Sequence, residues 1–258
     1  MPELLLDMLV LRDASRHFGG VKAIDGLDLE VRKGEILGLI GPNGSGKSTT
    51  VNLIAGLYAP SRGTVHFLGE DIAALTPDQR AVRGIARTFQ NIRLFGHLTV
   101  WQNLWAAQVV RESGWAGWRR RWLAGATAAR EEAEKLLAFS GLADKRDLLA
   151  GNLAFGEQRR LELARAAASG APLLMLDEPA AGMNAEEIDE LDVRIRALRD
   201  QGRTVLLIEH HMELVMEVCD RIVVLNFGRK IAEGTPAQVQ NDPQVRAAYL
   251  GAEEPATA

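Results

Sequence analysis

Nine consecutive residues form the most specific chemical pattern in the chain, a phosphate-binding loop. They are Gly41, Pro42, Asn43, Gly44, Ser45, Gly46, Lys47, Ser48 and Thr49, and the first eight match G-x-x-x-x-G-K-[ST]. Glycines at this spacing let successive backbone N–H groups turn toward phosphate oxygens, and a helix beginning here adds the positive end of its dipole. Lys47 would reach the β- and γ-phosphates, and the Ser48 hydroxyl would bind Mg²⁺. The pattern predicts a site for a nucleoside triphosphate; the alternative is a glycine-rich turn with an unrelated lysine.

Two adjacent acids form the second chemical feature. The apolar run 173–176 leads directly into Asp177 and Glu178, as expected of a buried parallel strand that delivers acids at its C-terminal end. Asp177 would hold the Mg²⁺ shell, and Glu178 would polarise a water for in-line attack on the γ-phosphate. Acids before a proline could also begin a helix, but the apolar strand before them fits that alternative poorly.

Two further polar residues follow predicted strands. His210 comes just after the apolar run 204–208, which we expect beside the Asp177 strand, so His210 would lie near the γ-phosphate. Gln90 ends the run 84–90 and could reach Mg²⁺ or water. A lone histidine is more often a core or surface residue, and we assign the neighbouring His211 to the surface.

The surrounding segments must hold these residues in place. We expect a β-rich, antiparallel opening with strands over 9–14, 27–31, 64–69 and 84–90 and a turn at Pro77, while the strand 35–40 leads into the phosphate loop. Helices are predicted over 127–140, 155–169 and about 186–200. The apolar runs 173–177, 204–208 and 221–225 predict buried strands, the last followed by a hairpin.

Composition narrows the function further. The chain has 258 residues, 47% of them hydrophobic, a net charge of −4 and a single cysteine, Cys219. It therefore has no global basic field for nucleic acid and no internal disulfide framework, and we expect Cys219 to be buried. The first residues are too few and too acidic for a signal peptide, and no run approaches the roughly 18 to 20 apolar residues that span a bilayer. We expect a cytoplasmic protein that reaches a membrane only through a partner.

Taken together, these motifs resemble the ATP-binding subunits of ABC transporters. The phosphate loop is similar to Walker A, residues 173–178 to Walker B, Gln90 to the Q-loop and His210 to the H-loop. Phe18 stands where the family places an aromatic ring against adenine. Residues 180–184 fit the D-loop, and the signature position is occupied by Leu153, Ala154, Phe155, Gly156 and Glu157. The resemblance covers about residues 7–250.

The resemblance implies a fold and a mechanism. The fold would be an α/β P-loop NTPase, with a single ABC ATPase domain over 5–252 and a disordered tail over 253–258. That domain would contain a parallel core sheet, an antiparallel β subdomain and a helical subdomain over about 91–172. ATP and Mg²⁺ would be bound, with Ser48, Gln90 and Asp177 serving the metal. Two ATPase subunits would close head to tail on two nucleotides, so residues 153–157 would act in trans, and Glu178, His210 and Gln90 would act in hydrolysis.

A closer resemblance concerns the cargo. Residues 87–95, 152–161 and 247–251 are similar to the branched-chain amino acid importer subfamily. Chain length and the Leu-Ala-aromatic-Gly signature at 153–156 are similar to the longer of its two kinds of ATPase subunit. That subfamily implies a second, different ATPase subunit, two membrane permease subunits and an external solute-binding protein, with this chain at the cytoplasmic face of the membrane. Urea, short amides or exported lipopolysaccharide remain alternative cargoes. A soluble ABC ATPase acting on nucleic acid or ribosomes and a non-hydrolysing ATP sensor are rivals from other classes.

Two departures need separate interpretation. The family usually has serine where this chain has Ala154, which can neither cap the helix nor bond phosphate, so we expect a weakened half-site. The aromatic and basic segment 115–122 either packs inside the helical subdomain or contacts lipid or permease. Trp101 and Trp105 are expected to help form a permease-facing groove.

Overall fold

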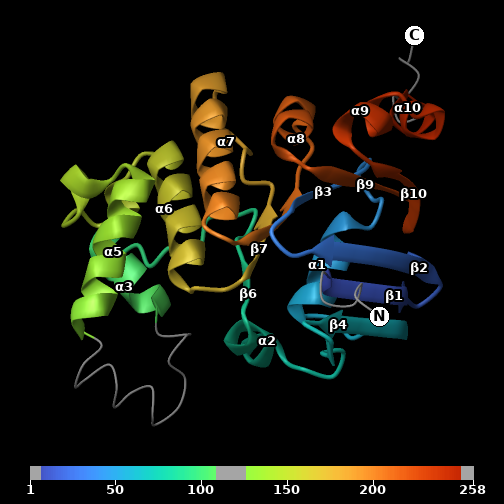
Figure 1. The fold of residues 1–258 in the computed structure, drawn as a ribbon, viewed down its shortest axis with the longest axis horizontal. Coiled ribbons are helices and arrows are strands. Elements are labelled where there is room, and N and C mark those ends of the chain that lie inside the picture. The colour runs from blue at the N-terminus through green and yellow to red at the C-terminus, as the bar shows by residue number, and fades with distance from the viewer. Residues whose placement is uncertain (1–6, 109–125, 251–258) are drawn as a thin grey trace.

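A central sheet organises the molecule in the computed structural model, which describes residues 7–108 and 126–250 (Figure 1). Its strand order is β10-β9-β3-β8-β7-β6, and every pairing is parallel except the terminal hairpin of β9 and β10. The bounds are β3 Ile36–Ile40, β6 Ile85–Arg87, β7 Leu173–Asp177, β8 Thr204–Ile208, β9 Arg221–Asn226 and β10 Arg229–Gly234. The parallel core predicted from the apolar runs is confirmed.

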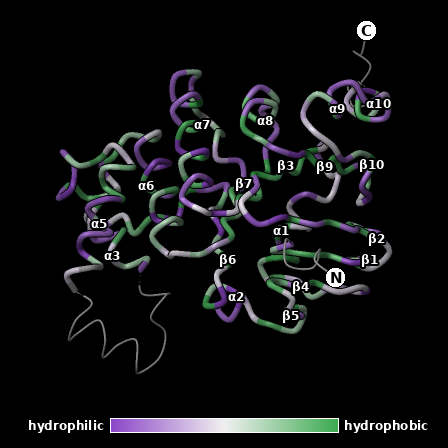
Figure 2. Tube along the Cα trace, viewed as in Figure 1, coloured by the Kyte–Doolittle hydropathy of each residue, from purple (hydrophilic) through white to green (hydrophobic). Residues whose placement is uncertain are grey.

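Both faces of this sheet are buried. Along β7, Leu174 and Leu176 join one apolar cluster, whereas Leu173 and Met175 join the other, as alternation along a strand requires. Figure 2 shows hydrophobic colouring along the central strands. Because helices or a second sheet cover each face, the strands are continuous apolar runs rather than alternating ones. Cys219 is buried in the first cluster, as predicted.

A second sheet, antiparallel throughout, packs against one face of the central sheet, together with the helix that follows the phosphate loop. Its order is β2-β1-β4-β5. Its strands and that helix are β1 Asp7–Phe18, β2 Val21–Arg32, β4 Arg62–Phe67, β5 Glu70–Asp71 and α1 Lys47–Ala55. Apolar residues of β1, β2, β4 and α1 share one cluster with β3, β7 and β8, so the phosphate loop emerges where the two sheets meet.

The remaining helices cover the other face and one end of the sheet (Figure 1). α3, α5 and α6 contact one another and form the group at the left of the figure. The bounds are α3 Val100–Ala107, α5 Ala126–Ser140, α6 Phe155–Ala168, α7 Ala185–Asp200, α8 Met212–Val218, α9 Pro236–Gln240 and α10 Pro243–Leu250, with short 3₁₀ turns at Ala143–Lys145 and Ala150–Asn152. In the described part of the chain, no helix is long and apolar enough to cross a membrane.

Two expectations about the opening segment were wrong. Pro77 does not mark a turn but begins helix α2, Pro77–Arg83, where a proline at the first position and the Thr76–Gln79 capping box favour helix. The strand 84–90 shortens to β6 and pairs in parallel with β7, instead of joining the antiparallel sheet. Pairing partners distant in sequence, which no local pattern specifies, decide that placement.

The tryptophan-rich region is only partly described. Residues 115–122 and the predicted tail 253–258 lie outside the described residues. Trp101 and Trp105 on α3 stack with ring centroids 5.1 Å apart, and Arg146 lies over the Trp101 ring. Trp101 also packs against the helical core.

Candidate functional site

The phosphate loop joins β3 to α1 in a backbone conformation that requires glycine. Gly41 has φ 149°, and a Cβ there would lie 2.1 Å from the carbonyl oxygen of Leu225. Gly46 has φ 106°, and its Cβ would lie 2.7 Å from the Ala23 carbonyl oxygen. The turn before β10 braces the loop, since the Gly228 N–H donates to the Ser45 carbonyl at 2.9 Å. Side chains at Gly41 or Gly46 would force the loop off its supports.

Lys47 folds back over this loop. Its ammonium donates to the carbonyl oxygens of Gly41 (2.6 Å) and Pro42 (3.0 Å), and only 8% of the residue is exposed. Burial lowers the pKa of the Lys47 ammonium, while the carboxylates of Glu178 and Asp177 act in the opposite direction. The Lys47 ammonium is thus held by the phosphate loop, close enough to Glu178 and Asp177 to be stabilised by their negative charges.

A small hollow of about 180 Å³ lies over the loop. Its lining combines Ala23 and Glu178 with seven loop residues, Asn43, Gly44, Ser45, Gly46, Lys47, Ser48 and Thr49. None of residues 153–157 is among them. Ser48 is exposed, which leaves its hydroxyl accessible. The hollow therefore places Glu178 opposite the phosphate loop.

The acid pair lies at the carboxyl end of β7, which is separated from β3 by β8. Asp177 is the last residue of β7 and pairs with Ile208 of β8. Glu178 follows in the left-handed region, with φ 49°, and its N–H donates to the Ile208 carbonyl at 2.8 Å. A non-glycine residue rarely adopts this conformation, and here it turns the Glu178 side chain out of the strand direction toward the hollow.

Gln90 and His210 both approach Glu178. The Gln90 amide Nε2 donates to Glu178 Oε2 at 2.8 Å, and His210 Nδ1 lies 3.8 Å from the same oxygen. The Glu178 side chain is 22% exposed and that of His210 is 63% exposed. The structure therefore brings together the three residues predicted to act in hydrolysis, with Gln90 bonded to the acid.

Glu209, which was not predicted from the sequence, connects the backbone segments that follow Glu178 and that contain His210. Its buried carboxylate accepts from three backbone N–H groups, those of Ala180 (2.7 Å), His210 (3.0 Å) and His211 (3.2 Å). It thus ties the loop after Glu178 to the start of α8. His211 is not a surface residue as predicted, because it is half-buried and its Nδ1 is buried without a partner.

Asp177 is paired with an arginine that the sequence analysis also left out. Arg87 Nη2 donates to Asp177 Oδ2 at 2.7 Å, and its Nη1 donates to Asn52 Oδ1 at 2.6 Å. The two charged side chains are 13% and 9% exposed. Thr88 adds a bond from the Asp177 N–H to its hydroxyl at 3.2 Å. The charge of Asp177, the carboxylate predicted to bind the metal, is therefore compensated by Arg87 at the end of β6.

Oxygen donors at the site suit Mg²⁺. Ser48 offers a hydroxyl, Asp177 a carboxylate and Gln90 an amide, and hard cations of this kind take oxygen ligands. Within residues 7–108 and 126–250, no group of three or more His, Cys, Asp or Glu residues could hold a metal ion. Such a cluster is not required, because Mg²⁺ is commonly held by one or two carboxylates together with substrate phosphates.

Phe18 ends β1 and is 40% exposed. Its ring meets Tyr58 edge-on, with centroids 5.1 Å apart, and the Arg16 guanidinium lies 4.7 Å from the Phe18 ring centre. Arg16 is held there by donating to the Ala59 carbonyl at 2.9 Å. The ring predicted to stack on adenine is thus fixed by two neighbours and keeps part of its surface open.

The signature residues surround the N-terminus of α6. Leu153 is buried, Phe155 is 49% exposed, and Ala154 is the N-cap without a side-chain bond. The Glu157 carboxylate accepts from the Ala154 N–H at 3.1 Å and pairs with Lys145, whose bond lowers the Glu157 pKa. Only one half of a capping box is present, because a methyl group cannot accept the reciprocal bond.

This half-formed cap leads to a prediction. Ala154→Ser should stabilise the chain by about 1 kcal/mol, because the hydroxyl would accept from an N–H of the first turn. For a domain of this size, the melting temperature should rise by about 2–4 °C. Differential scanning calorimetry measures the change, with Ala74→Ser, in an exposed loop, as the control. Equal effects of the two substitutions would show that the α6 cap is already satisfied.

The second turn of α6 grips the segment that carries Gln90, another link not predicted from the sequence. Arg159 donates to the carbonyls of Phe89 (3.2 Å) and Gln90 (2.6 Å), and Glu162 accepts from the Arg93 N–H at 3.2 Å. Burial raises the Glu162 pKa, against the influence of Arg159. The position of Gln90 therefore depends on the helix that begins at the signature.

The doubly covered parallel sheet, the glycine-dependent phosphate loop and the acids at the end of β7 define a P-loop nucleoside triphosphatase. A model of the family "ABC transporter" matches residues 24–181, more than half of the chain. The chain belongs to the ABC transporter family, as an ATP-binding subunit that hydrolyses ATP for transport. A second model, "Branched-chain amino acid ATP-binding cassette transporter", matches residues 229–255.

Curated relatives and solved structures agree with this assignment over nearly the whole chain. The high-affinity branched-chain amino acid transport ATP-binding protein LivG of Escherichia coli (strain K12) is 42% identical over 249 residues, 95% of this chain and 98% of LivG. The lipopolysaccharide export ATP-binding protein LptB of Haemophilus influenzae is 35% identical over 246 residues, 95% of this chain and 98% of LptB. The ADP conformation of an ABC transporter cassette superposes with a TM-score of 0.84, at 32% identity, covering 95% of this chain and 99% of that cassette. The predicted cassette fold is confirmed.

Proposed function

We propose that this chain powers the uptake of branched-chain amino acids through membrane permease subunits. The choice of cargo rests on sequence similarity over the whole chain and at its C-terminus. The chain is 42% identical to LivG along nearly its whole length, and its C-terminal segment matches the branched-chain amino acid transporter model. Lipopolysaccharide export is the second candidate, supported by 35% identity to LptB. Urea and short amides remain alternative cargoes.

In the proposed mechanism, ATP enters the hollow above the phosphate loop. Phe18 stacks on adenine, and the backbone of residues 41–49 surrounds the phosphates. The Lys47 ammonium exchanges the carbonyls of Gly41 and Pro42 for phosphate oxygens, which as anions are stronger acceptors. Mg²⁺, held by Ser48, Gln90 and Asp177, would neutralise charge on the β- and γ-phosphates.

Hydrolysis then depends on Glu178. Its Oε2 accepts from Gln90 in the structure, and the remaining lone pairs of the carboxylate can take a proton from an attacking water. His210 lies near the same oxygen, where it can contact the γ-phosphate. Residues 153–157 are absent from the lining of the chain's own hollow, which supports their action in trans, on the nucleotide of a second ATPase subunit. We propose that this second subunit is a different chain.

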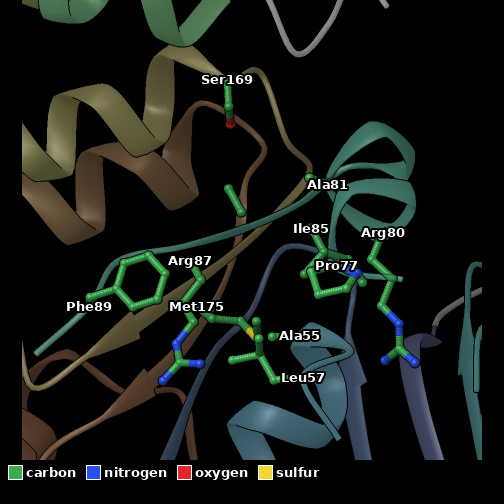
Figure 3. Close-up of a pocket in the computed structure, with 11 residues that line it drawn as sticks. Ala55, Leu57, Pro77, Arg80, Ala81, Ile85, Arg87, Phe89, Ser169 and Met175 are labelled. Carbon is green, nitrogen blue, oxygen red and sulfur yellow. The ribbon is translucent and has the colours of Figure 1, made fainter. Parts of the chain in front are cut away.

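An apolar hollow of about 230 Å³ gives the permease a place to bind (Figure 3). Its lining comes from the end of α1, from α2, from β6 and its neighbours, and from the end of α6: Ala55, Leu57, Pro77, Arg80, Ala81, Ile85, Ala86, Arg87, Phe89, Ser169 and Met175. Trp101 and Trp105, expected to form the groove, are not among these residues. We infer that a cytoplasmic helix of a permease subunit sits here, one residue from Gln90, and holds the chain at the cytoplasmic face of the membrane. An external solute-binding protein would complete the importer.

The cargo can be tested in the source organism. The chromosomal copy is replaced by Glu178→Gln, and uptake of labelled leucine, isoleucine and valine is measured beside urea uptake and surface lipopolysaccharide. We expect uptake of the three amino acids to be lost while the other two readings stay unchanged. Normal leucine uptake with defective lipopolysaccharide or urea transport would replace this proposal with the corresponding alternative.

A further inference from the structure

Arg87 belongs to two places at once, the permease hollow and the acid site. It is the last residue of β6, opposite Met175 of β7, and it lines the apolar hollow with Phe89 and Met175. Figure 3 shows its side chain beside the Phe89 ring, and the guanidinium lies 5.1 Å from the centre of that ring. From the same position it donates to Asp177 at 2.7 Å. No other side chain that lines this hollow is bonded to either acid of the site in the described part of the chain.

The Arg87 guanidinium binds Asp177 strongly, but not all of its N–H donors are paired. Both side chains are nearly buried, so their attraction is only weakly screened by solvent. Nη1 and Nη2 are bonded to Asn52 and Asp177, whereas the buried Nε has no partner. A guanidinium that leaves one donor unpaired loses less on moving than one whose donors are all paired. Arg87 is therefore held in place but can be displaced.

Its charge opposes a metal at Asp177. A carboxylate has about four lone-pair sites, so Arg87 and a cation can share it sterically. A fixed positive charge beside the carboxylate nevertheless repels a divalent cation, and the repulsion is large where water is largely excluded. With the hollow empty, Arg87 thus lowers the affinity of Asp177 for Mg²⁺.

The hollow offers a way to change this. Asn52, which lies on α1, is the second partner of Arg87 and accepts from it through its side-chain Oδ1. The backbone carbonyl of Asn52 accepts from the N–H of Leu57, a residue of the hollow wall. A helix inserted between Leu57, Phe89 and Ala81 would press on the walls that position Arg87. Contact there would reach Asp177 through a single side chain.

We propose that Arg87 is a positioning residue that keeps Asp177 from binding Mg²⁺ strongly until a permease helix occupies the hollow. This inference rests on the proposed function, in that the hollow receives the permease and Asp177 serves the metal. It adds a regulatory link between them: the unassembled subunit binds the metal weakly, so ATP is hydrolysed efficiently only in the assembled transporter.

The test measures metal binding rather than turnover. Mn²⁺, as a spectroscopic substitute for Mg²⁺, is titrated by electron paramagnetic resonance into the isolated chain with a non-hydrolysable ATP analogue. Arg87→Met, which keeps an apolar stem in the hollow, should bind Mn²⁺ about tenfold more tightly than the wild type, within the usual range for coupled neighbouring sites. Arg87→Lys, which keeps the charge, should stay close to the wild type. Arg83→Met, which removes an exposed arginine paired with Glu70, is the control.

Assembly gives a second reading that does not depend on how well the variant folds alone. Wild-type chain in the purified transporter should bind Mn²⁺ more tightly than isolated chain, and Arg87→Met should remove that difference. Unchanged or weaker Mn²⁺ binding by Arg87→Met, or an assembly effect that survives the substitution, overturns the proposal. Because neither reading involves the cargo, failure here is distinguishable from a failure of the amino-acid uptake experiment.

Discussion

Glu178→Gln should lower ATP turnover by about 10²–10⁴-fold, the usual contribution of a positioned general base. The carboxylate lies over the phosphate loop and is the only acid that lines the hollow there within the described residues. An amide of the same shape can still accept from Gln90 but cannot take a proton from water. The backbone bond from residue 178 to Ile208 does not involve the side chain, so we expect the strained turn to survive. Phosphate release measures the loss.

The comparison needs an acid that lies elsewhere. Glu217 is exposed on α8, so Glu217→Gln should leave turnover unchanged. ATP affinity of Glu178→Gln should stay near that of the wild type, since the substitution does not alter the loop. Size-exclusion chromatography of this variant with ATP and Mg²⁺ then reports closure: a dimer would show that two copies can pair, whereas a monomer would indicate a different ATPase partner. Turnover close to wild type in Glu178→Gln would exclude Glu178 as the base.

The sequence predicted best those features that are local. The phosphate loop, β7 and its two acids are each specified within about ten residues, because glycines, a lysine and an apolar run act on their own neighbours. The parallel core followed from three apolar runs, and the sheet confirmed it. Helix α2 was missed although its signal was equally local: Thr76, Pro77 and Gln79 form a proline-started capping box that was interpreted as a turn.

What the sequence could not show depends on contacts between distant segments. Glu209 stands one residue before His210, yet its role comes from the N–H of Ala180, which lies 29 positions away. Arg159 holds the carbonyl of Gln90 across 69 positions. Charged residues of this kind look like solvated surface in a linear pattern, because burial is decided only when helices and strands pack. The same reason hid the pairing of Arg87 with Asp177.

Lys47→Met should weaken ATP binding by about ten- to a hundredfold, because a hydrogen bond to a charged group contributes about 1.5–3 kcal/mol. The substitution keeps an apolar stem of similar length and removes the ammonium that bridges Gly41 and Pro42. Isothermal titration calorimetry with a non-hydrolysable ATP analogue measures the change. Lys33→Met, which alters an exposed lysine in the turn before β3, should bind the analogue like the wild type.

Thermal unfolding separates this role from a structural one. Burial lowers the pKa of the Lys47 ammonium, which means that the folded chain holds that charge at a cost when no phosphate is present. An apolar side chain avoids this cost but leaves the Gly41 and Pro42 carbonyls without their donor. Because the two effects oppose each other, the melting temperature of Lys47→Met without nucleotide should change little. With ATP analogue the wild type should be stabilised according to its affinity, whereas the variant should gain much less at the same concentration. If the variant instead melts lower without nucleotide and gains as much as the wild type with it, then Lys47 supports the loop rather than the phosphates.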